Sequence, residues 1–123
     1  MNSSVDTLDF SASTLGITVS LNQNVLQVIS PVLSIQLRFE TVAGSVPDFE
    51  NVIGGSGDDS ITGNALSNIL RGGQGNDVLI DAGTPLVATI DLWVGGDGND
   101  TYRFTTTATT HLVRILEDIG TGG

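Results

Sequence analysis

The sequence predicts an all-β domain, and three observations lead to this prediction. Apolar and polar residues alternate over residues 15–21 and 33–40, as they do in strands that bury one face. A nine-residue pattern rich in Gly and Asp recurs between residues 54 and 103. No amphipathic helix of convincing length can be traced, while the β-formers Val, Ile and Thr are abundant and Lys is absent.

The expected strands follow in order along the chain. Residues 15–21 and 33–40 come first, each with its apolar residues on one face. Short strands then recur at the end of every nine-residue unit of the middle zone. After a Thr-rich stretch over residues 105–110, residues 111–116 are again strand-like.

The composition narrows the classes of function and of metal ion. The 123 residues carry 14 acidic side chains and four Arg, for a net charge of -10. This charge argues against nucleic acids and anionic membranes as partners, because both require a basic face. The absence of Cys excludes disulfides and thiol catalysis, and a single His leaves no His-rich metal cluster. Any metal ion is therefore expected to be hard and bound by oxygen.

Length and hydropathy predict one folded domain. A hydrophobic share of 39% is too high for a disordered acidic chain. The first residues lack the basic and apolar regions of a secretory signal, and no apolar run approaches the about 18 residues of a membrane span. We therefore expect that export, where it occurs, is directed from outside this chain.

The middle of the chain consists of nine-residue repeats. Residues 54–62, 72–80 and 95–103 share Gly at places one, two and four and Asp at place six, and residues 63–71 form a weaker copy. The copy at 95 begins 23 residues after the copy at 72 instead of 18, so five residues are inserted within 81–91. Place eight is always large and apolar, as a column of inward-facing strand residues requires; it holds Val52, Ile61, Leu70, Leu79, Trp93 and Tyr102.

These repeats resemble the RTX (repeats-in-toxin) family, a haemolysin-type calcium-binding repeat module with the nonapeptide G-G-x-G-x-D-x-U-x. The resemblance implies an all-β, right-handed parallel β-roll or β-helix with flanking capping β-strands, in which two nines make one coil. Turns 18 residues apart then stack on one edge, about 4.8 Å apart. Glycine lets carbonyl oxygens converge there, and Ca²⁺ prefers about six to eight oxygen ligands. The implied cofactor is Ca²⁺.

Carried over place by place, the family pattern implies two calcium sites that share Asp77. The first would use the carboxylates of Asp59 and Asp77 with the carbonyls of Gly55, Gly57, Gly72 and Gln74. The second would use the carboxylates of Asp77 and Asp100 with the carbonyls of Gly73, Gly75, Gly95 and Asp97. On the opposite edge, Asn64, Asn68 and the long segment 81–91 depart from the pattern, which puts a complete third site in doubt.

The flanks also resemble RTX modules. Residues 49–54 look like the lead-in to a first coil, and residues 5–11 look like a segment that follows a Gly-rich stretch such as 117–123. We therefore expect an N-terminal β-strand segment at 1–53 that caps or extends the roll. A calcium β-roll at 54–104 with an inserted loop at about 81–91 follows, and then a C-terminal strand and Gly-rich connection to a following module at 105–123. Neighbouring modules of the same parent chain are expected partners.

Other interpretations of the same residues stay open. Gly and Asp also form ordinary hairpin turns, although the regular spacing favours calcium turns. A phosphate loop is disfavoured because Asp follows each G-x-G unit, directly or after one Asn, and Lys never does. Asp58 and Asp59 are adjacent, so their side chains are expected to point apart and not to form a catalytic pair. His111 is expected on the surface of a strand, and Trp93 in the core instead of on a sugar-stacking platform.

The resemblance implies a calcium-binding RTX module of a larger secreted bacterial protein, without catalytic residues, that folds on Ca²⁺ binding after type I secretion. Its expected location is extracellular, either secreted or at the cell surface. The excess negative charge fits this interpretation, because acidic side chains repel one another until cations neutralise them. The alternative is a repeated adhesin or carbohydrate-binding module of a cell-surface or polysaccharide-active protein with an extracellular glycan as partner, which exposed aromatic rings near Trp93 and Tyr102 would favour.

Overall fold

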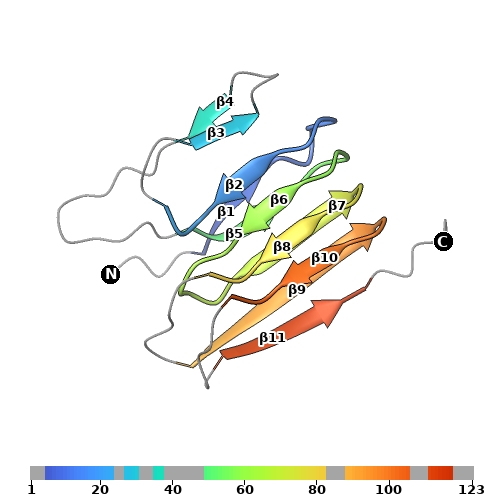
Figure 1. The fold of residues 1–123 in the computed structure, drawn as a ribbon. Coiled ribbons are helices and arrows are strands. Elements are labelled where there is room, and N and C mark those ends of the chain that lie inside the picture. The colour runs from blue at the N-terminus through green and yellow to red at the C-terminus, as the bar shows by residue number, and fades with distance from the viewer. Residues whose placement is uncertain are drawn as a thin grey trace.

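A computed structural model describes residues 5–23, 27–30, 35–37, 49–82, 88–105 and 111–117. In these ranges the chain forms strands and no helix, and so nothing in them has the form of a membrane-spanning helix (Figure 1). The strands are β1 (Asp6–Asp9), β2 (Thr18–Ser20), β3 (Gln27–Ser30), β4 (Ile35–Leu37), β5 (Phe49–Ile53), β6 (Ser60–Thr62), β7 (Ile69–Gln74), β8 (Val78–Ile80), β9 (Thr89–Asp97), β10 (Thr101–Arg103) and β11 (His111–Leu116). The strand predicted over residues 15–21 is present but shorter, at Thr18–Ser20, and those predicted over 33–40 and 111–116 are confirmed where the structure describes them.

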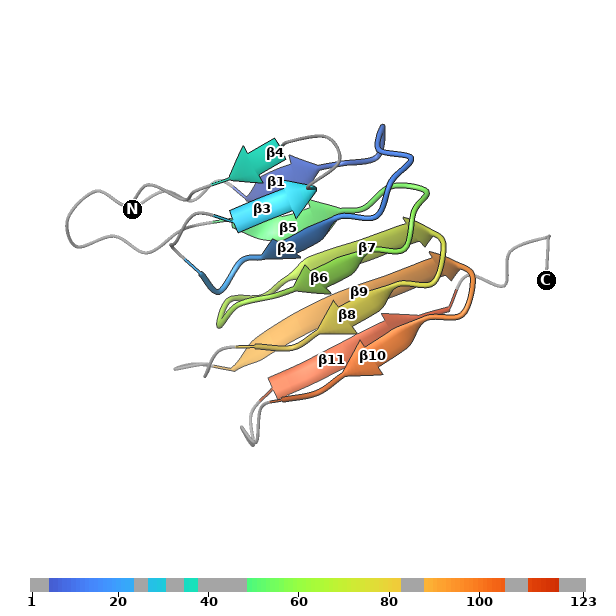
Figure 2. The ribbon, with the colours of Figure 1, turned by 45° about the horizontal axis from the view of Figure 1, so that its top comes forward.

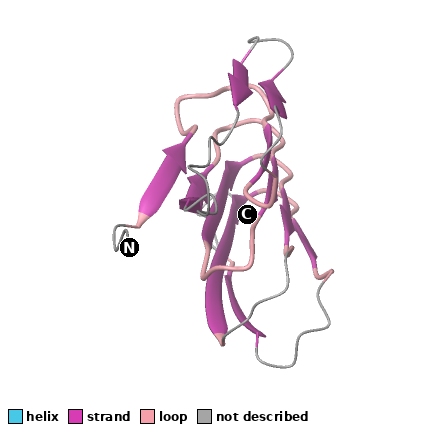
Figure 3. Ribbon diagram, turned by 90° about the vertical axis from the view of Figure 1, so that its left-hand side faces the viewer, coloured by secondary structure: helices cyan, strands magenta, loops and turns pink. Residues whose placement is uncertain are grey.

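Two parallel sheets form the body of the molecule. One has the order β1-β5-β7-β9-β11 and the other the order β10-β8-β6-β2, and every neighbouring pair is parallel. Apart from β3 and β4, successive strands alternate between the sheets, so two strands and two turns make one coil (Figure 2). Seen from the side, the sheets lie as two layers (Figure 3). This arrangement is the predicted parallel β-roll.

The N-terminal segment adds a coil to the roll. Leu8 in β1 pairs with Val52 in β5, and Val19 in β2 pairs with Ile61 in β6. The antiparallel pair β3 and β4 follows this first coil and forms a small sheet of its own. Of the two roles predicted for this segment, extending the roll is the one that the strand pairing supports, while the division at residues 53 and 104 stays a prediction.

The core is the space between the two sheets. The predicted place-eight residues Val52, Ile61, Leu70, Leu79 and Trp93 are all 0% exposed. Burying one large apolar side chain contributes about 1.5–3 kcal/mol, so this column is a main source of the fold's stability. Tyr102 is only half-buried, because β10 is the last strand of its sheet.

Trp93 tests the predicted position of the insertion. It pairs with Leu70 on one side and with Ile115 on the other, which keeps it in the core column. Its ring also stacks on those of Tyr102 and Phe104, with centroids 6.3 and 5.3 Å away. The five extra residues therefore leave the register of the later turns intact; the centre of the predicted loop, residues 83–87, lies outside the described residues.

Candidate metal centre

The Gly-Asp turns stack on one edge of the roll, at the upper right in Figure 1. Gly73 is in register with Gly96, and Gln74 with Asp97. The N–H of Gln74 donates to the carbonyl of Gly55, 3.0 Å away, which ties the second turn to the first. The backbone thus brings the three turns into the vertical arrangement that the 18- and 23-residue separations predicted.

The place-six carboxylates form a ladder along this edge. Oδ1 of Asp100 accepts the N–H of Asp77 at 3.0 Å, and Oδ1 of Asp77 accepts the N–H of Asp59 at 2.8 Å. Oδ1 of Asp59 then accepts the N–H of Ile17 at 2.9 Å. Each carboxylate therefore holds the turn that precedes it in the sequence.

The second oxygens of these carboxylates differ in their partners. Oδ2 of Asp59 accepts the N–H of Gly55 at 2.7 Å. Oδ2 of Asp77 and Oδ2 of Asp100 are buried and have no hydrogen-bond partner. A buried, unpaired carboxylate oxygen is costly unless it is protonated or bound by a cation. These two atoms are therefore suited to a hard cation such as Ca²⁺.

The first glycine of each turn allows oxygens from two turns to converge. A Cβ on Gly72 would lie 2.1 Å from Oδ2 of Asp77 and 2.6 Å from the carbonyl oxygen of Gly95. A Cβ on Gly54 would similarly lie 2.2 Å from the carbonyl oxygen of Gly72 and 2.3 Å from Oδ2 of Asp59. These two carboxylate and carbonyl pairs belong to the predicted second and first calcium sites.

The other predicted ligands lie in the same stack but are engaged between turns. The carbonyls of Gly55, Gly57, Gly73 and Gly75 each lie against the matching glycine of the next turn. Those next-turn glycines, Gly73, Gly75, Gly96 and Gly98, all have positive φ, which explains why glycine occupies these places. The carbonyl of Asp97 accepts the N–H of Gly75 at 2.9 Å. The full ligand sets stay predictions.

Charge is concentrated on this edge. Burial is the main cause that raises the pKa of Asp77 to about 7, and the nearby carboxylates of Asp59, Asp100 and Asp58 raise it further. Burial likewise raises the pKa of Asp59, although the N–H groups of Ile17 and Gly55 lower it in part. A cation between the turns would relieve both desolvation and repulsion.

Asp58 and Asp59 do not form a pair at one site. Asp58 is exposed, and its Oδ1 accepts the N–H of Asn76 in the next turn. Asp59 is 2% exposed and faces the stack. Their different directions match the expectation for adjacent residues.

On the opposite edge, the turn of residues 63–68 uses amides where the first edge uses carboxylates. Asn68 occupies place six, and its Nδ2 donates to the carbonyl of Glu50 at 3.0 Å and to Oδ1 of Asn64 at 2.9 Å. Its Oδ1 accepts the N–H of Asn64 at 2.8 Å. Because the amide is both donor and acceptor, this turn is satisfied without a cation.

Two features of the edges were not predicted from the sequence. Ile17, 1% exposed, occupies place six of the first coil, where its N–H meets Asp59. Its turn lacks the Gly-Gly pair and is two residues longer than the RTX turns, so the repeat could not be recognised in the sequence. His111 was expected at the surface, but its side chain is 4% exposed and lies beside Asp81 and Asp91.

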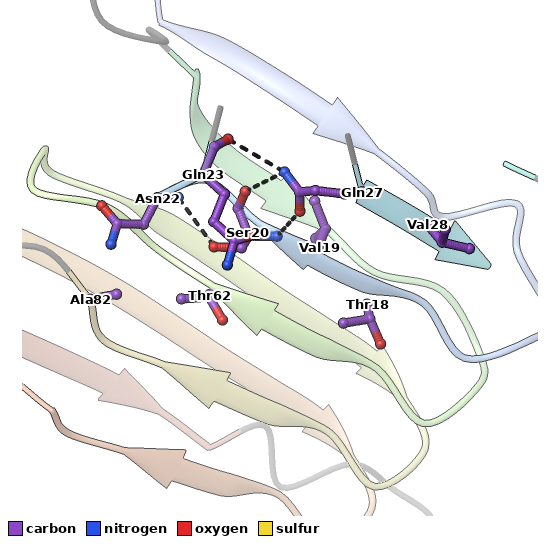
Figure 4. A pocket seen from close by; sticks show the side chains of 9 residues that line it. All are labelled: Thr18, Val19, Ser20, Asn22, Gln23, Gln27, Val28, Thr62 and Ala82. Atoms are coloured by element: carbon purple, nitrogen blue, oxygen red, sulfur yellow. Dashed lines mark hydrogen bonds between the residues drawn. The ribbon is translucent and has the colours of Figure 1, made fainter. Parts of the chain in front are cut away.

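One open pocket lies between β2 and β3 (Figure 4). The side chain of Gln27 connects β3 to β2. It accepts the N–H of Ser20 and donates to the carbonyl of Ser20, both at 2.8 Å. The lining contains neither an aromatic ring nor an ionisable group; it consists of Thr18, Val19, Ser20, Asn22, Gln23, Gln27, Val28, Thr62 and Ala82. It therefore offers no group for acid-base catalysis or for stacking on a sugar.

Comparison with known families agrees with the geometry of the turns. Residues 48–79 match the family model described as RTX calcium-binding nonapeptide repeat (4 copies). This segment therefore carries RTX repeats, a structural calcium-binding module. The match ends before the turn at residues 95–100, although the structure stacks that turn in register with its predecessor. No curated protein matches the chain.

Proposed function

We propose that this chain is a calcium-dependent folding module of a larger secreted bacterial protein. The observation that supports it best is the pair of buried, unpaired oxygens on Asp77 and Asp100 within stacked turns. Ca²⁺ would supply the positive charge that these carboxylates lack, and the residues that would hold it are those of the two predicted sites. The chain's own contribution is to position carbonyls and carboxylates around each ion.

The folded fraction of the chain would increase with calcium concentration. A ligand that binds only the folded state stabilises it by about 2.7 kcal/mol at a hundred times its dissociation constant. Two such ions would match much of the net stability of a small domain, which is about 5–15 kcal/mol. The module would stay unfolded in the low-calcium cytosol and fold outside the cell after type I secretion.

Far-UV circular dichroism of the whole chain tests this proposal. We expect the β signal to fall on calcium removal and to return with Ca²⁺ but not with Mg²⁺, whose octahedral, water-retaining coordination does not suit these turns. An unchanged spectrum in excess chelator would overturn calcium-dependent folding.

The C-terminal end of the roll supports neighbouring modules as partners. Ile115 occupies the core column in β11 but is 40% exposed, and Phe104 is 54% exposed. A further coil would cover these side chains and pair with the edge of β11. A tandem of two copies should therefore melt at a higher temperature than one copy, and equal melting temperatures would contradict this role.

A glycan-binding role finds less support, although the ring of Phe104 is 54% exposed beside Trp93. Trp93 is 0% exposed and so cannot present its ring to a sugar. The hydroxyl of Tyr102 accepts the N–H of Gly95 at 3.1 Å and is turned toward the calcium turns.

A further inference from the structure

Three side chains that the calcium turns do not use meet on the opposite edge of the roll. Asp81 follows β8, Asp91 lies in β9, and His111 begins β11. Nε2 of His111 lies 3.5 Å from Oδ1 of Asp81 and 3.3 Å from Oδ2 of Asp91. One ligand atom from each side chain lies within 4.8 Å of the other two.

These groups are buried and incompletely paired. The side chains of His111, Asp81 and Asp91 are 4%, 1% and 2% exposed. Nε2 of His111 and Oδ2 of Asp81 have no hydrogen-bond partner. Two carboxylates and an imidazole nitrogen thus face one another with almost no water-accessible surface, which is costly unless a bound cation or a protonated imidazole places a positive charge among them.

The surrounding contacts hold the three side chains in this orientation. Oγ1 of Thr89 lies 2.6 Å from Nδ1 of His111, so the ring is fixed with Nε2 toward the carboxylates. Oδ1 of Asp91 accepts the N–H of Asn68 at 2.9 Å, which leaves Oδ2 to face His111. The backbone of Asp81 is held as well, because its N–H donates to the carbonyl of Arg103. A hydrogen bond to the second ring nitrogen is the usual outer-shell support of a metal-binding histidine.

The spacing fits a small transition-metal ion. Zinc bonds to nitrogen and oxygen of about 2.0–2.2 Å place two tetrahedral ligand atoms about 3.3–3.5 Å apart. The two contacts of Nε2 have these lengths. Calcium is disfavoured because it takes about six to eight oxygen ligands, whereas this cluster offers an imidazole nitrogen and few oxygens.

We propose that Asp81, Asp91 and His111 bind a divalent transition-metal ion of the Zn²⁺ type, independently of the calcium turns. Two carboxylates and a neutral imidazole balance the charge of such an ion, and borderline metals accept this mixture of ligands. The ion would connect β8, β9 and β11 at the end of the roll, on either side of the inserted segment.

The experiment uses the calcium-saturated chain and Zn²⁺ as the probe. We expect calorimetry to show one Zn²⁺ per chain, and His111→Ala or Asp91→Asn to abolish this binding. Thr89→Val should weaken it by about tenfold to a hundredfold, because only the outer support of the ring is lost. Asp9→Asn is the matched control, since Asp9 is exposed at the other end of the roll, and it should bind Zn²⁺ like the parent chain.

A second measurement does not depend on whether the variants fold. His111 is the only histidine, so its imidazole nitrogens give one set of ¹⁵N signals in the parent chain. We expect the Nε2 signal to shift on addition of one equivalent of Zn²⁺ and to stay unchanged with Mg²⁺. An unshifted Nε2 signal, or Zn²⁺ binding by a folded His111→Ala variant as tight as in the parent chain, would overturn the proposal. Because calcium is present throughout, failure of calcium-dependent folding would be seen separately in its own titration.

Discussion

Asp77 lies in the middle turn of the stacked Gly-Asp turns, between Asp59 and Asp100. One of its oxygens accepts the N–H of Asp59, and the other lies unpaired beside Gly72, close to the carbonyl of Gly95. Its carboxylate thus has one oxygen toward each neighbouring turn. The position between Asp59 and Asp100 is consistent with the prediction that it serves two ions.

Asp77→Asn should reduce calcium binding more than any comparable change on this edge. The amide keeps the acceptor for the N–H of Asp59 but removes the negative charge shared by both predicted sites. Asp58→Asn is the control, because Asp58 is exposed and pairs only with Asn76 in the described structure. Calorimetric titration should show fewer or weaker ions for Asp77→Asn; equal binding by the two variants would contradict the shared-ligand geometry.

Gly72→Ala separates calcium binding from packing. Its new Cβ would lie 2.1 Å from Oδ2 of Asp77, so the carboxylate must move, at a cost of about 1–3 kcal/mol. Gly63→Ala has a matching clash with Oδ1 of Asn68, 2.4 Å away, on the edge satisfied by amides. Both variants should lower the midpoint of urea unfolding, but only Gly72→Ala should weaken calcium binding in a titration. Equal calcium affinity in both would argue against a ligand role for Asp77.

At the scale of the strands, β9 follows the insertion and pairs with β7, which precedes it. Trp93→Ala should destabilise the calcium-loaded roll by about 3–5 kcal/mol, because it leaves a cavity between the sheets. Trp93→Phe should cost clearly less, since it keeps an aromatic ring beside Tyr102 and Phe104. Urea unfolding in calcium measures both; similar losses for the two variants would mean that ring packing contributes little.

The repeating strands could be predicted because their spacing is local and regular. A fixed place eight was sufficient to identify Trp93 as a core residue despite the insertion, and the Gly-Asp turns were sufficient to predict the edge on which the carboxylates stack. The first coil could not be predicted in this way, because β1 pairs with β5 at a separation of 44 residues and β2 with β6 at 42. No single repeat period connects those strands to the rest.

The His111 cluster could not be predicted for a related reason. His111 pairs with Thr89 across a separation of 22 residues, which spans a complete coil with extra residues relative to the 18-residue period. Asp81 is separated from Asp91 by the segment that carries the insertion. A single histidine far from both acids gives no spacing that indicates a metal site, and so the sequence favoured a surface position.

For the whole molecule, a rise in pH should destabilise the calcium-free fold and strengthen calcium binding. Asp77 has a pKa of about 7 in the calcium-free fold against an ordinary value of 3.8. Between these values the folded chain holds a proton that the unfolded chain has lost, so the stability of the calcium-free fold decreases as pH rises from about 4 to about 7. The same proton must leave before Ca²⁺ binds to that carboxylate.

Calcium-free protein should therefore show more β signal, or a higher unfolding midpoint, at pH 5 than at pH 8. Calcium affinity should change in the opposite sense and be higher at pH 8. Far-UV circular dichroism and calorimetry measure the two effects, and Asp77→Asn should reduce both. Greater stability of the calcium-free chain at pH 8 would show that the burial of a charged Asp77 does not control its stability.

The carboxylate ladder gives the roll a polarity of assembly. Asp100 accepts the place-six N–H of Asp77, Asp77 accepts that of Asp59, and Asp59 accepts that of Ile17, so along this ladder each acceptor comes later in the chain than its donor. Along this ladder, a chain that folds from its C-terminal side adds each place-six N–H to an acceptor already in place, whereas the exposed place-five N–H of Asn76 bonds to Asp58 of the preceding turn. We expect the buried ladder to outweigh the exposed bonds, so growth of the roll should run backward along the sequence, and loss of the last turn should loosen the earlier ones more than loss of the first coil loosens the rest.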